Sequence, residues 1–289
     1  MKKDRLWGDP AKRIEEAIRD FINTSPENTL KNKENEKAWE DVLIGFSSGA
    51  DPLYQEYKEY VGPFHRTPLE IFREAFPEIG AQAGDLTVIS WVLPSTEATK
   101  ADNRKETLYP SERWARARIF GEAFNVKLAK HVTATLEEAG FKALVPSQSP
   151  LWKTMPSERF TMASTWSERH AVYASGLGTF GLCDGLITSR GKAIRCGSVI
   201  ALIRIPPTER PYSHHRAYCL FFSKGTCGKC ISRCPVEALS TAGHDKVKCR
   251  TYLEDTRKYV PAHFGFEGYG CGLCQTGVPC ESGIPLHTE

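Results

Sequence analysis

The ten cysteines of this 289-residue chain are unevenly placed, and their placement constrains the fold more than any other feature. None precedes Cys183, whereas eight lie between Cys219 and Cys280. The chain has no run of about 18 apolar residues, and no apolar stretch follows its N-terminal lysines, so we expect a cytoplasmic protein with no membrane partner. In a reducing compartment, clustered cysteines indicate metal ligands rather than disulfides. The formal net charge of +3 is too weak to favour nucleic-acid binding.

The first cysteine cluster, "CLFFSKGTCGKCISRCP", matches part of a bacterial ferredoxin run, which reads C-x2-C-x2-C-x3-C-P. Cys227, Cys230 and Cys234-Pro235 fit this spacing, but the fourth cysteine lies further upstream, at Cys219. Four more cysteines follow, in a second cluster that ends with "CGLCQTGVPC". Eight thiolates are enough for two 4Fe–4S clusters.

The ferredoxin pattern also predicts how the cysteines divide, because the cysteine before proline binds the other cluster in two-cluster modules. The first ligand set is then Cys219, Cys227, Cys230 and Cys280, and the second is Cys234, Cys249, Cys271 and Cys274. Repeated C-x2-C pairs are also typical of zinc ribbons. The Cys-Pro pair and the full count of eight favour iron–sulfur clusters over zinc.

Hydrophobic periodicity and capping signals predict an α/β (α+β) fold. Helices are expected over 10–22, from Thr67 with a capping box to Glu70, over 111–140 as one bent helix, and over 167–176. Strands are expected at 86–93, at 141–147 and as a pair within 184–205 joined by a turn at 189–192. A proline-rich stretch at 206–215 predicts two domains, 1–210 and 211–289, the second containing the cysteine clusters.

The stretch "GLGTFG", residues 176–181, matches the dinucleotide fingerprint G-x-G-x-x-G. That fingerprint requires a strand before it and a helix after it. Here a helical pattern precedes the glycines and a strand pattern follows them, so nicotinamide dinucleotide binding is not expected. The glycines still indicate tight turns or close approach of the backbone to another group.

The segment "SERHAVYASGLGTFGLCDGLIT", together with "KCRTYLED" and "GYGCGLCQTGVPC", resembles the epoxyqueuosine reductases and reductive dehalogenases. The similarity runs from about Tyr109 to Cys280, and residues 167–280 contain most of it. The resemblance implies an oxidoreductase with a nitroreductase-like domain that binds a corrinoid (cobalamin). A small ferredoxin-like module with two 4Fe–4S clusters would follow that domain.

The resemblance also assigns residues to the cofactor and to catalysis. It implies a corrinoid lining made of Arg169, His170, Ser175, Gly176, Gly178, Gly181, Gly185, Leu186, Ile187 and Thr188. Tyr109 and Cys183 are the candidate catalytic residues, with Glu168 as a second candidate acid. Each has a purely structural alternative: Cys183 as an inert buried thiol, His170 as a satisfied helical histidine, and Tyr109 as a packing residue. Cys196 is expected in the core.

The chain departs from the family pattern at two positions in this segment. Met162 stands where epoxyqueuosine reductases have a proton-donating aspartate, and Leu182-Cys183 replaces a Lys-His pair. The sequence stops soon after the second cluster, so the tRNA-binding repeats of the family, and tRNA as a partner, are not expected. We expect a reductase for a small organic substrate, with a ferredoxin or flavodoxin as electron donor. Two alternatives stay open: an electron-transfer or reactivating protein for a partner's cofactor, and a reductase with another cofactor such as a flavin.

Overall fold

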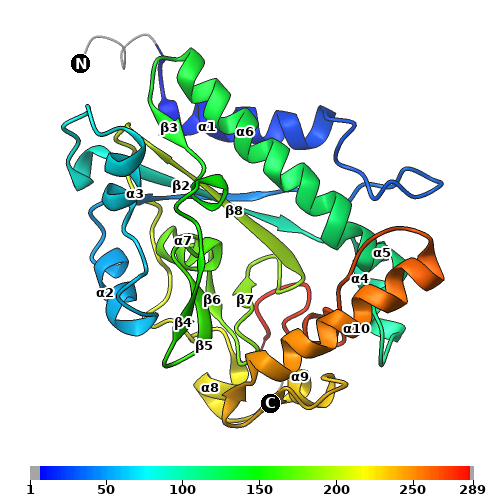
Figure 1. Ribbon diagram of the computed structural model, residues 1–289. Helices are drawn as coiled ribbons and strands as arrows, with labels where there is room; N and C mark the ends of the chain where they lie inside the picture. The colour runs from blue at the N-terminus through cyan, green and yellow to red at the C-terminus, as the bar shows by residue number, and fades with distance from the viewer. Residues whose placement is uncertain (1–6, 287–289) are drawn as a thin grey trace.

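The computed structural model describes residues 7–286 and contains a four-stranded sheet with helices on both faces (Figure 1). The strand order is β1-β2-β8-β3, formed by β1 (Leu43–Ser48), β2 (Thr87–Pro94), β8 (Ile194–Ala201) and β3 (Ala143–Leu144). Every pairing in the sheet is antiparallel. β2 is buried along its whole length, as the apolar run at 86–93 predicted. The mixed α/β class is therefore confirmed, with antiparallel strand pairing.

One face of the sheet is covered by α1 (Pro10–Thr24) and α6 (Glu122–Glu138). The predicted first helix is confirmed: the Asp9 side chain accepts a hydrogen bond from the backbone N–H of Lys12, and Pro10 occupies the first turn. The isoleucines of the apolar stripe are buried against α6 and the sheet, at positions Ile14, Ile18 and Ile22.

The predicted bent helix over 111–140 is a continuous helical run with a π-helical turn inside it. α5 (Glu112–Arg116) leads into the π turn at Ala117–Gly121 and then into α6. Gly121 packs against Trp39 so closely that a Cβ atom there would lie 2.6 Å from the indole ring. The Trp39 indole N–H also donates to the Gly121 carbonyl oxygen over 3.0 Å. This contact coincides with the turn where the regular α-helical hydrogen bonds are interrupted.

The opposite face is covered by α2 (Leu53–Tyr60), α3 (Pro68–Ala75) and α7 (Glu168–Ala174). The capping box from Thr67 to Glu70 is present, so this expectation is confirmed. The helix expected over 167–176 is α7, which packs on β8 beside the buried Trp166. No helix within residues 7–286 has the length and apolar character needed to cross a membrane.

Two small hairpins lie beneath α7, between the main sheet and the cysteine-rich end (Figure 1). β4 (Thr154–Ser157) pairs with β5 (Thr161–Ser164), and β6 (Gly178–Phe180) pairs with β7 (Leu186–Thr188). The turn expected at 189–192 is present, because Thr188 and Gly191 form a bridge. The strands on its two sides, however, join different sheets: β7 pairs with β6, and β8 pairs with β2.

The cysteine-rich segment contains α8 (Leu220–Lys224), α9 (Lys229–Ser232), a two-residue hairpin of β9 (Leu239–Ser240) and β10 (Gly243–His244), and α10 (Lys246–Phe264). Its contact with the rest of the chain includes α4 (Glu97–Lys105). Arg233 donates to the carbonyl oxygens of Asn103 and Glu106, over 3.2 and 2.9 Å. The Asn103 side-chain amide donates in turn to the Thr276 hydroxyl.

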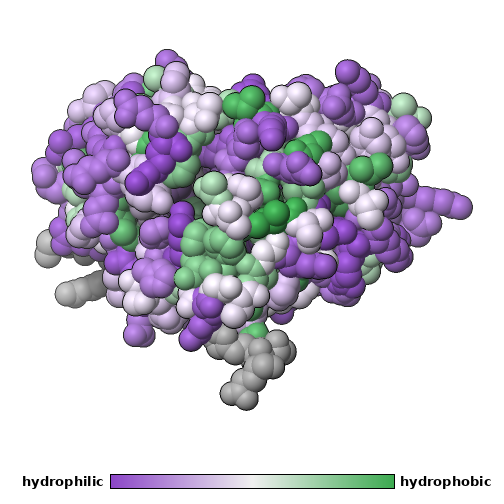
Figure 2. Space-filling view, turned by 90° about the horizontal axis from the view of Figure 1, so that it is seen from below, coloured by the Kyte–Doolittle hydropathy of each residue, from purple (hydrophilic) through white to green (hydrophobic). Residues whose placement is uncertain are grey.

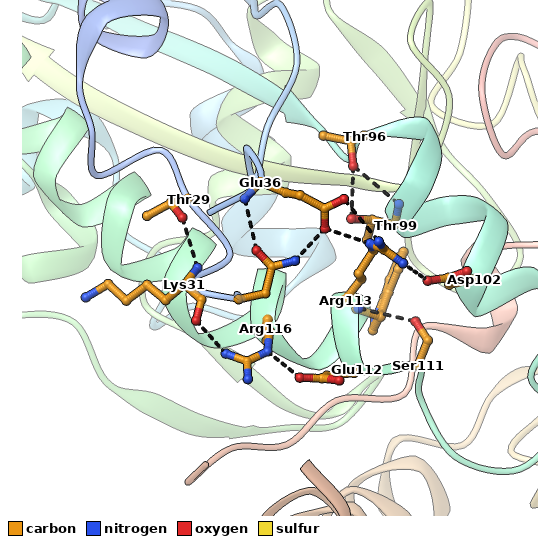
Figure 3. Close-up of polar contacts among 12 residues, drawn as sticks. Thr29, Lys31, Glu36, Thr96, Thr99, Asp102, Ser111, Glu112, Arg113 and Arg116 are labelled. Carbon is orange, nitrogen blue, oxygen red and sulfur yellow. Dashed lines mark hydrogen bonds and ion pairs between the residues drawn. The ribbon is translucent and has the colours of Figure 1, made fainter. Parts of the chain in front are cut away.

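A polar network holds α4 and the start of α5 in place (Figure 3). Arg113 contacts both carboxylate oxygens of Glu36, over 2.8 and 3.0 Å, and also pairs with Asp102 of α4. The Thr96 and Ser111 side chains cap the two helices. Because these ion pairs are only half-buried, each contributes little to the free energy of unfolding. Their main effect is to hold α4 in its position.

Candidate metal centre

Four cysteines line one narrow cavity at the lower end of the molecule. They are Cys219, Cys227, Cys230 and Cys280, the set that the ferredoxin pattern assigned to the first cluster. The cavity is otherwise walled mainly by apolar residues, and Lys192 is the one charged residue that lines it within residues 7–286. All four are free thiols, and thiolate sulfur is the ligand type that soft metals and iron–sulfur clusters prefer.

Local structure explains how Cys219 reaches this cavity from its position upstream. Cys219 is the N-cap of α8, and the short helix occupies most of the sequence between Cys219 and Cys227. Gly225 ends α8 in the left-handed conformation, with φ of +68°, which favours glycine. Cys230 lies within α9, and Cys280 lies in the loop that ends the described chain.

The second set, Cys234, Cys249, Cys271 and Cys274, is placed by α9, α10 and the short turn at Leu273–Gln275. Burial raises the pKa of Cys271 to about 12, and the neighbouring thiols Cys249 and Cys234 add to the shift. A hydrogen bond with Cys183, together with burial, raises the pKa of Cys274 well above its usual value.

Buried thiols with raised pKa values bind metal only as they lose their protons, so assembly of the site would release protons. Within residues 7–286, no group of three or more His, Cys, Asp or Glu side chains is placed to hold a single metal ion. A 4Fe–4S cluster makes a different demand, because each cysteine binds a different iron atom and the four ligands surround the cluster. The four thiols of the first set all line one cavity.

Cys183 lies beside both cysteine sets and away from solvent. Its Sγ is 3.3 Å from the Lys192 ammonium nitrogen. A hydrogen bond with Cys274 and the charge of Lys192 lower the pKa of Cys183 well below its usual value. Sequence reasoning missed Lys192, since a lysine in a glycine-containing turn is ordinarily exposed. Cys196 is buried on β8, in the core, and burial raises its pKa to about 12.

An open groove adjoins the first set on the outside of the molecule, next to Cys227. Arg104, Lys229, Ser232 and Glu281 contribute its polar lining. Figure 2 shows this end of the molecule from below, with apolar residues gathered near the middle and hydrophilic residues around them.

The glycine run packs against the chain itself. Gly176 has φ of +79°, and a Cβ atom there would lie 2.5 Å from the carbonyl oxygen of Glu209. A Cβ atom on Gly178 would lie 2.5 Å from the carbonyl oxygen of Ile187, across the β6–β7 hairpin. The helix-before-strand order expected around this run is present, with α7 before it and β6 inside it. Close backbone approach, rather than nucleotide binding, accounts for these glycines.

Some of the expected corrinoid-lining residues are buried within the protein, and others are at least partly exposed to solvent. Ser175 is fully buried and hydrogen-bonds to Ser47 and Ser90, while Leu186, Ile187 and Thr188 are buried in the hairpin. Gly181 is also buried and donates to the Gly185 carbonyl oxygen in a tight turn. Arg169 is exposed and donates to the Asp184 carbonyl, and His170 and Gly185 are half-buried.

His170 of α7 belongs to a cluster of aromatic rings that also contains Tyr57, His65 and Phe180. Its Nδ1 lies 2.8 Å from the Ser167 hydroxyl, and its ring contacts Tyr57 and Phe180. Burial lowers the pKa of His170 well below its usual value. His65, in the same cluster, is 1% exposed, and neither of its ring nitrogens has a hydrogen-bond partner within the described residues. The sequence did not single out His65.

The candidate acids lie at different places around α7 and α10. Burial raises the pKa of Glu168 to about 7, and its Oε1 has no hydrogen-bond partner within the described residues. Tyr109 stacks on Tyr259 of α10. Met162, at the position of the family's aspartate, accepts a hydrogen bond at its carbonyl oxygen from Lys246, so the β4–β5 hairpin contacts the start of α10.

Comparison with known proteins finds partial similarity to epoxyqueuosine reductases. No family model matches the chain. Epoxyqueuosine reductase of Bacillus anthracis is 32% identical over 129 residues, which are 43% of this chain and 32% of that protein. The Staphylococcus aureus epoxyqueuosine reductase is 30% identical over 124 residues, 41% of this chain and 30% of that protein. The chain thus matches about a third of the length of these curated relatives.

Solved structures show the same fold over more of the chain. A selenomethionine-labelled epoxyqueuosine reductase superposes with a TM-score of 0.50 at 16% identity, covering 96% of this chain and 68% of that one. The catabolic reductive dehalogenase NpRdhA superposes with a TM-score of 0.51 at 13% identity, covering 84% of this chain and 30% of that one. At these identities the likeness concerns the fold.

Proposed function

We propose that the chain is a divergent member of the superfamily of epoxyqueuosine reductases and reductive dehalogenases, and that it is an iron–sulfur oxidoreductase that reduces a small organic substrate. The observation that carries the proposal is the cavity lined by Cys219, Cys227, Cys230 and Cys280. A ferredoxin or flavodoxin is the proposed electron donor. The proposed architecture is a nitroreductase-like domain over 1–210 and a two-cluster, ferredoxin-like domain over 211–289.

The eight cysteines of the two sets are the proposed ligands of two 4Fe–4S clusters. Thiolate sulfur is the ligand type that such clusters require, and apolar side chains pack around Cys219, Cys230 and Cys280 of the first set. Cys274 of the second set and Cys280 of the first both lie near Lys192. This closeness supports electron transfer between the two sets.

The proposal includes a corrinoid, which when bound would supply a metal centre able to pass electrons to the substrate. Of the expected lining, Arg169 is exposed, and His170, Gly176 and Gly185 are half-buried. Arg169 would offer a guanidinium to polar groups on the edge of the cofactor, and its bond to the Asp184 carbonyl orients it. Glu168, which is partly protonated near neutral pH, would hold a proton at its buried carboxyl.

Anaerobic purification followed by iron, sulfide and cobalt analysis tests this function. We expect about eight iron atoms per chain and, on titration with cobalamin, one bound corrinoid seen by absorbance and paramagnetic resonance. About eight iron atoms without cobalamin binding would remove the corrinoid from the proposal. A yellow, cobalt-free chromophore would identify a flavin in its place. Absence of iron would overturn the proposed function altogether.

One observation favours a second candidate, an electron-transfer or reactivating protein that reduces a partner's cofactor. The proposed corrinoid would lie against the glycine run. The space beside Gly176 and Gly178 is occupied by the chain's own backbone. Such a protein would retain both clusters and transfer electrons to a partner without turning over a small molecule. Cluster-loaded protein that reduces an added corrinoid protein but binds no free cobalamin would establish this candidate.

A further inference from the structure

Lys192 is a buried cation at the meeting point of the two cysteine sets. Its side chain is 2% exposed, and it lines the cavity of the first set. Its ammonium nitrogen lies 3.3 Å from the Cys183 Sγ and 3.5 Å from the carbonyl oxygen of Cys274, which belongs to the second set. It shares the lining of that cavity with Cys280 of the first set. One ammonium group therefore contacts both proposed cluster environments.

Lys192 is surrounded by sulfur atoms. Besides Cys183, it shares the cavity of the first set with Cys219, Cys227, Cys230 and Cys280. The lysine side chain ends in an ammonium group, which carries one positive charge. A fixed positive charge in a water-poor environment acts strongly on nearby charges, because little solvent screens it.

The backbone around Lys192 is shaped to hold the side chain in this position. A Cβ atom on Gly185 would lie 3.1 Å from the Lys192 Cδ, so a glycine there leaves room for the lysine stem. The Lys192 backbone N–H donates to the Glu281 carbonyl oxygen over 3.1 Å. Gly191, with φ of +84°, allows the turn to approach the same carbonyl. The turn before β8 is thereby tied to the loop that contains Cys280.

Building on the proposed two-cluster function, we infer that Lys192 is a positioning residue that raises the reduction potentials of both clusters. When a cluster accepts one electron from the donor, its charge becomes more negative by one, and no bond forms or breaks. A cation beside the ligand sulfurs stabilises that reduced form. Lys192 therefore makes both clusters easier to reduce, and it couples them, because the reduction of either alters the field at the shared ammonium group.

Lys192→Met tests the inference, with Lys229→Met as the matched control. Both changes remove one positive charge beside a proposed ligand, but Lys229 is exposed next to Cys230 and is screened by solvent. The readouts are iron per chain and the midpoint potentials from a redox titration followed by paramagnetic resonance. For Lys192→Met we expect the reduced-to-oxidised ratio at a fixed potential to fall about tenfold for each cluster, a shift of about 59 mV. Lys229→Met should change that ratio by less than about twofold.

Lys192→Arg separates charge from shape and covers the case in which Lys192→Met fails to hold iron. Iron-loaded Lys192→Arg with potentials near those of the wild type supports the charge role. Three results would overturn the charge role of Lys192. They are loss of iron in both Lys192→Met and Lys192→Arg, equal shifts of the midpoint potentials in these two variants, and unchanged midpoint potentials in iron-loaded Lys192→Met. Wild-type protein without clusters would instead overturn the proposed function, so the two failures are distinguishable.

Discussion

Tyr109 lies flat against Tyr259 of α10, with ring centroids 3.9 Å apart and ring planes within 3° of parallel. Tyr259 stacks in turn on His263, with centroids 3.8 Å apart. Tyr109 precedes α5, whereas α10 carries Cys249 of the second cysteine set. The stack therefore joins the sheet-containing part of the molecule to the helix that presents a proposed ligand. This packing uses the ring of Tyr109, and its hydroxyl forms no hydrogen bond with the part of the chain that the structure describes.

Tyr109→Phe and Tyr109→Ala separate these two roles. We expect Tyr109→Phe to retain the wild-type Tm and iron content, because the ring stack is preserved. Tyr109→Ala should lower the free energy of unfolding by about 1 to 2 kcal/mol, as lost aromatic contacts typically do. Thermal unfolding under anaerobic conditions measures both. A wild-type Tm in Tyr109→Ala would show that the stack contributes nothing, and a loss of turnover in Tyr109→Phe at unchanged Tm would assign the hydroxyl to proton transfer.

Cys219→Ser should remove one of the two clusters. Cys219 lines the cavity with three other thiols, so its loss leaves that cluster without its fourth ligand. We expect iron to fall from about eight to about four atoms per chain. Cys196→Ser is the matched control, because Cys196 is equally buried but lies on β8 in a different core. Cys183→Ser should also leave iron unchanged. Equal iron in Cys219→Ser and the wild type would remove Cys219 from the ligand set.

Gly178→Ala should destabilise the protein whether or not a cofactor is present. A Cβ atom at this position would lie 2.5 Å from the Ile187 carbonyl oxygen, so the β6–β7 hairpin must open. Backbone displacement of this kind typically costs about 1 to 3 kcal/mol. Gly80→Ala is the control, since a Cβ atom there has no heavy atom within 4 Å and the φ angle is not in the left-handed region. Equal Tm values for the two variants would contradict the packing explanation of the glycine run.

Glu168 should make the protein less stable as the pH rises. Burial raises the pKa of Glu168 from 4.5 to about 7, so the folded protein holds a proton that the unfolded chain has already lost between these values. The contribution of Glu168 to the free energy of unfolding is therefore fully present below about pH 4.5. It declines as the pH rises towards 7, by at most about 3 kcal/mol. Glu168→Gln should flatten this part of the Tm profile between pH 5 and 8. Parallel profiles for variant and wild type would show that Glu168 titrates normally.

His65 should weaken the fold in acid. Burial lowers the pKa of His65 from 6.5 to about 4, with a smaller contribution from Lys58. The unfolded chain therefore binds a proton in this range that the folded protein does not, and stability is lost as the pH falls from about 6.5 towards 4. His65→Phe keeps the ring against Tyr57 and Trp166 and removes two unpartnered nitrogens.

The measurement is the Tm of His65→Phe and wild type at pH 7 and pH 5. We expect the variant to lose less Tm on acidification than the wild type does. His263→Phe, at an exposed position, serves as the control and should follow the wild-type profile. An identical fall in all three proteins would exclude His65 as a source of acid sensitivity.

The sequence by itself determined the features that depend on neighbours along the chain. Asp9 and Thr67 each cap a helix because the capped N–H groups lie within three residues of them. The thiol spacing around Cys227 and Cys230 predicted a cysteine site, and these two residues line one cavity with Cys219 and Cys280. The helix-before-strand order around the glycine run was likewise readable from periodicity.

Only the tertiary structure decided which distant groups meet. It placed β7 and β8 in different sheets, although a single turn joins them, because strand pairing is set by long-range contacts. It also supplied the partners of Gly176 and Gly178, which are backbone carbonyls of residues 209 and 187. Lys192 carries no sequence signal of burial, since its partners Cys183, Cys274 and Cys280 come from three separate segments. The Lys192 charge acts strongly on those sulfurs because the fold brings them around it and little water screens the interaction.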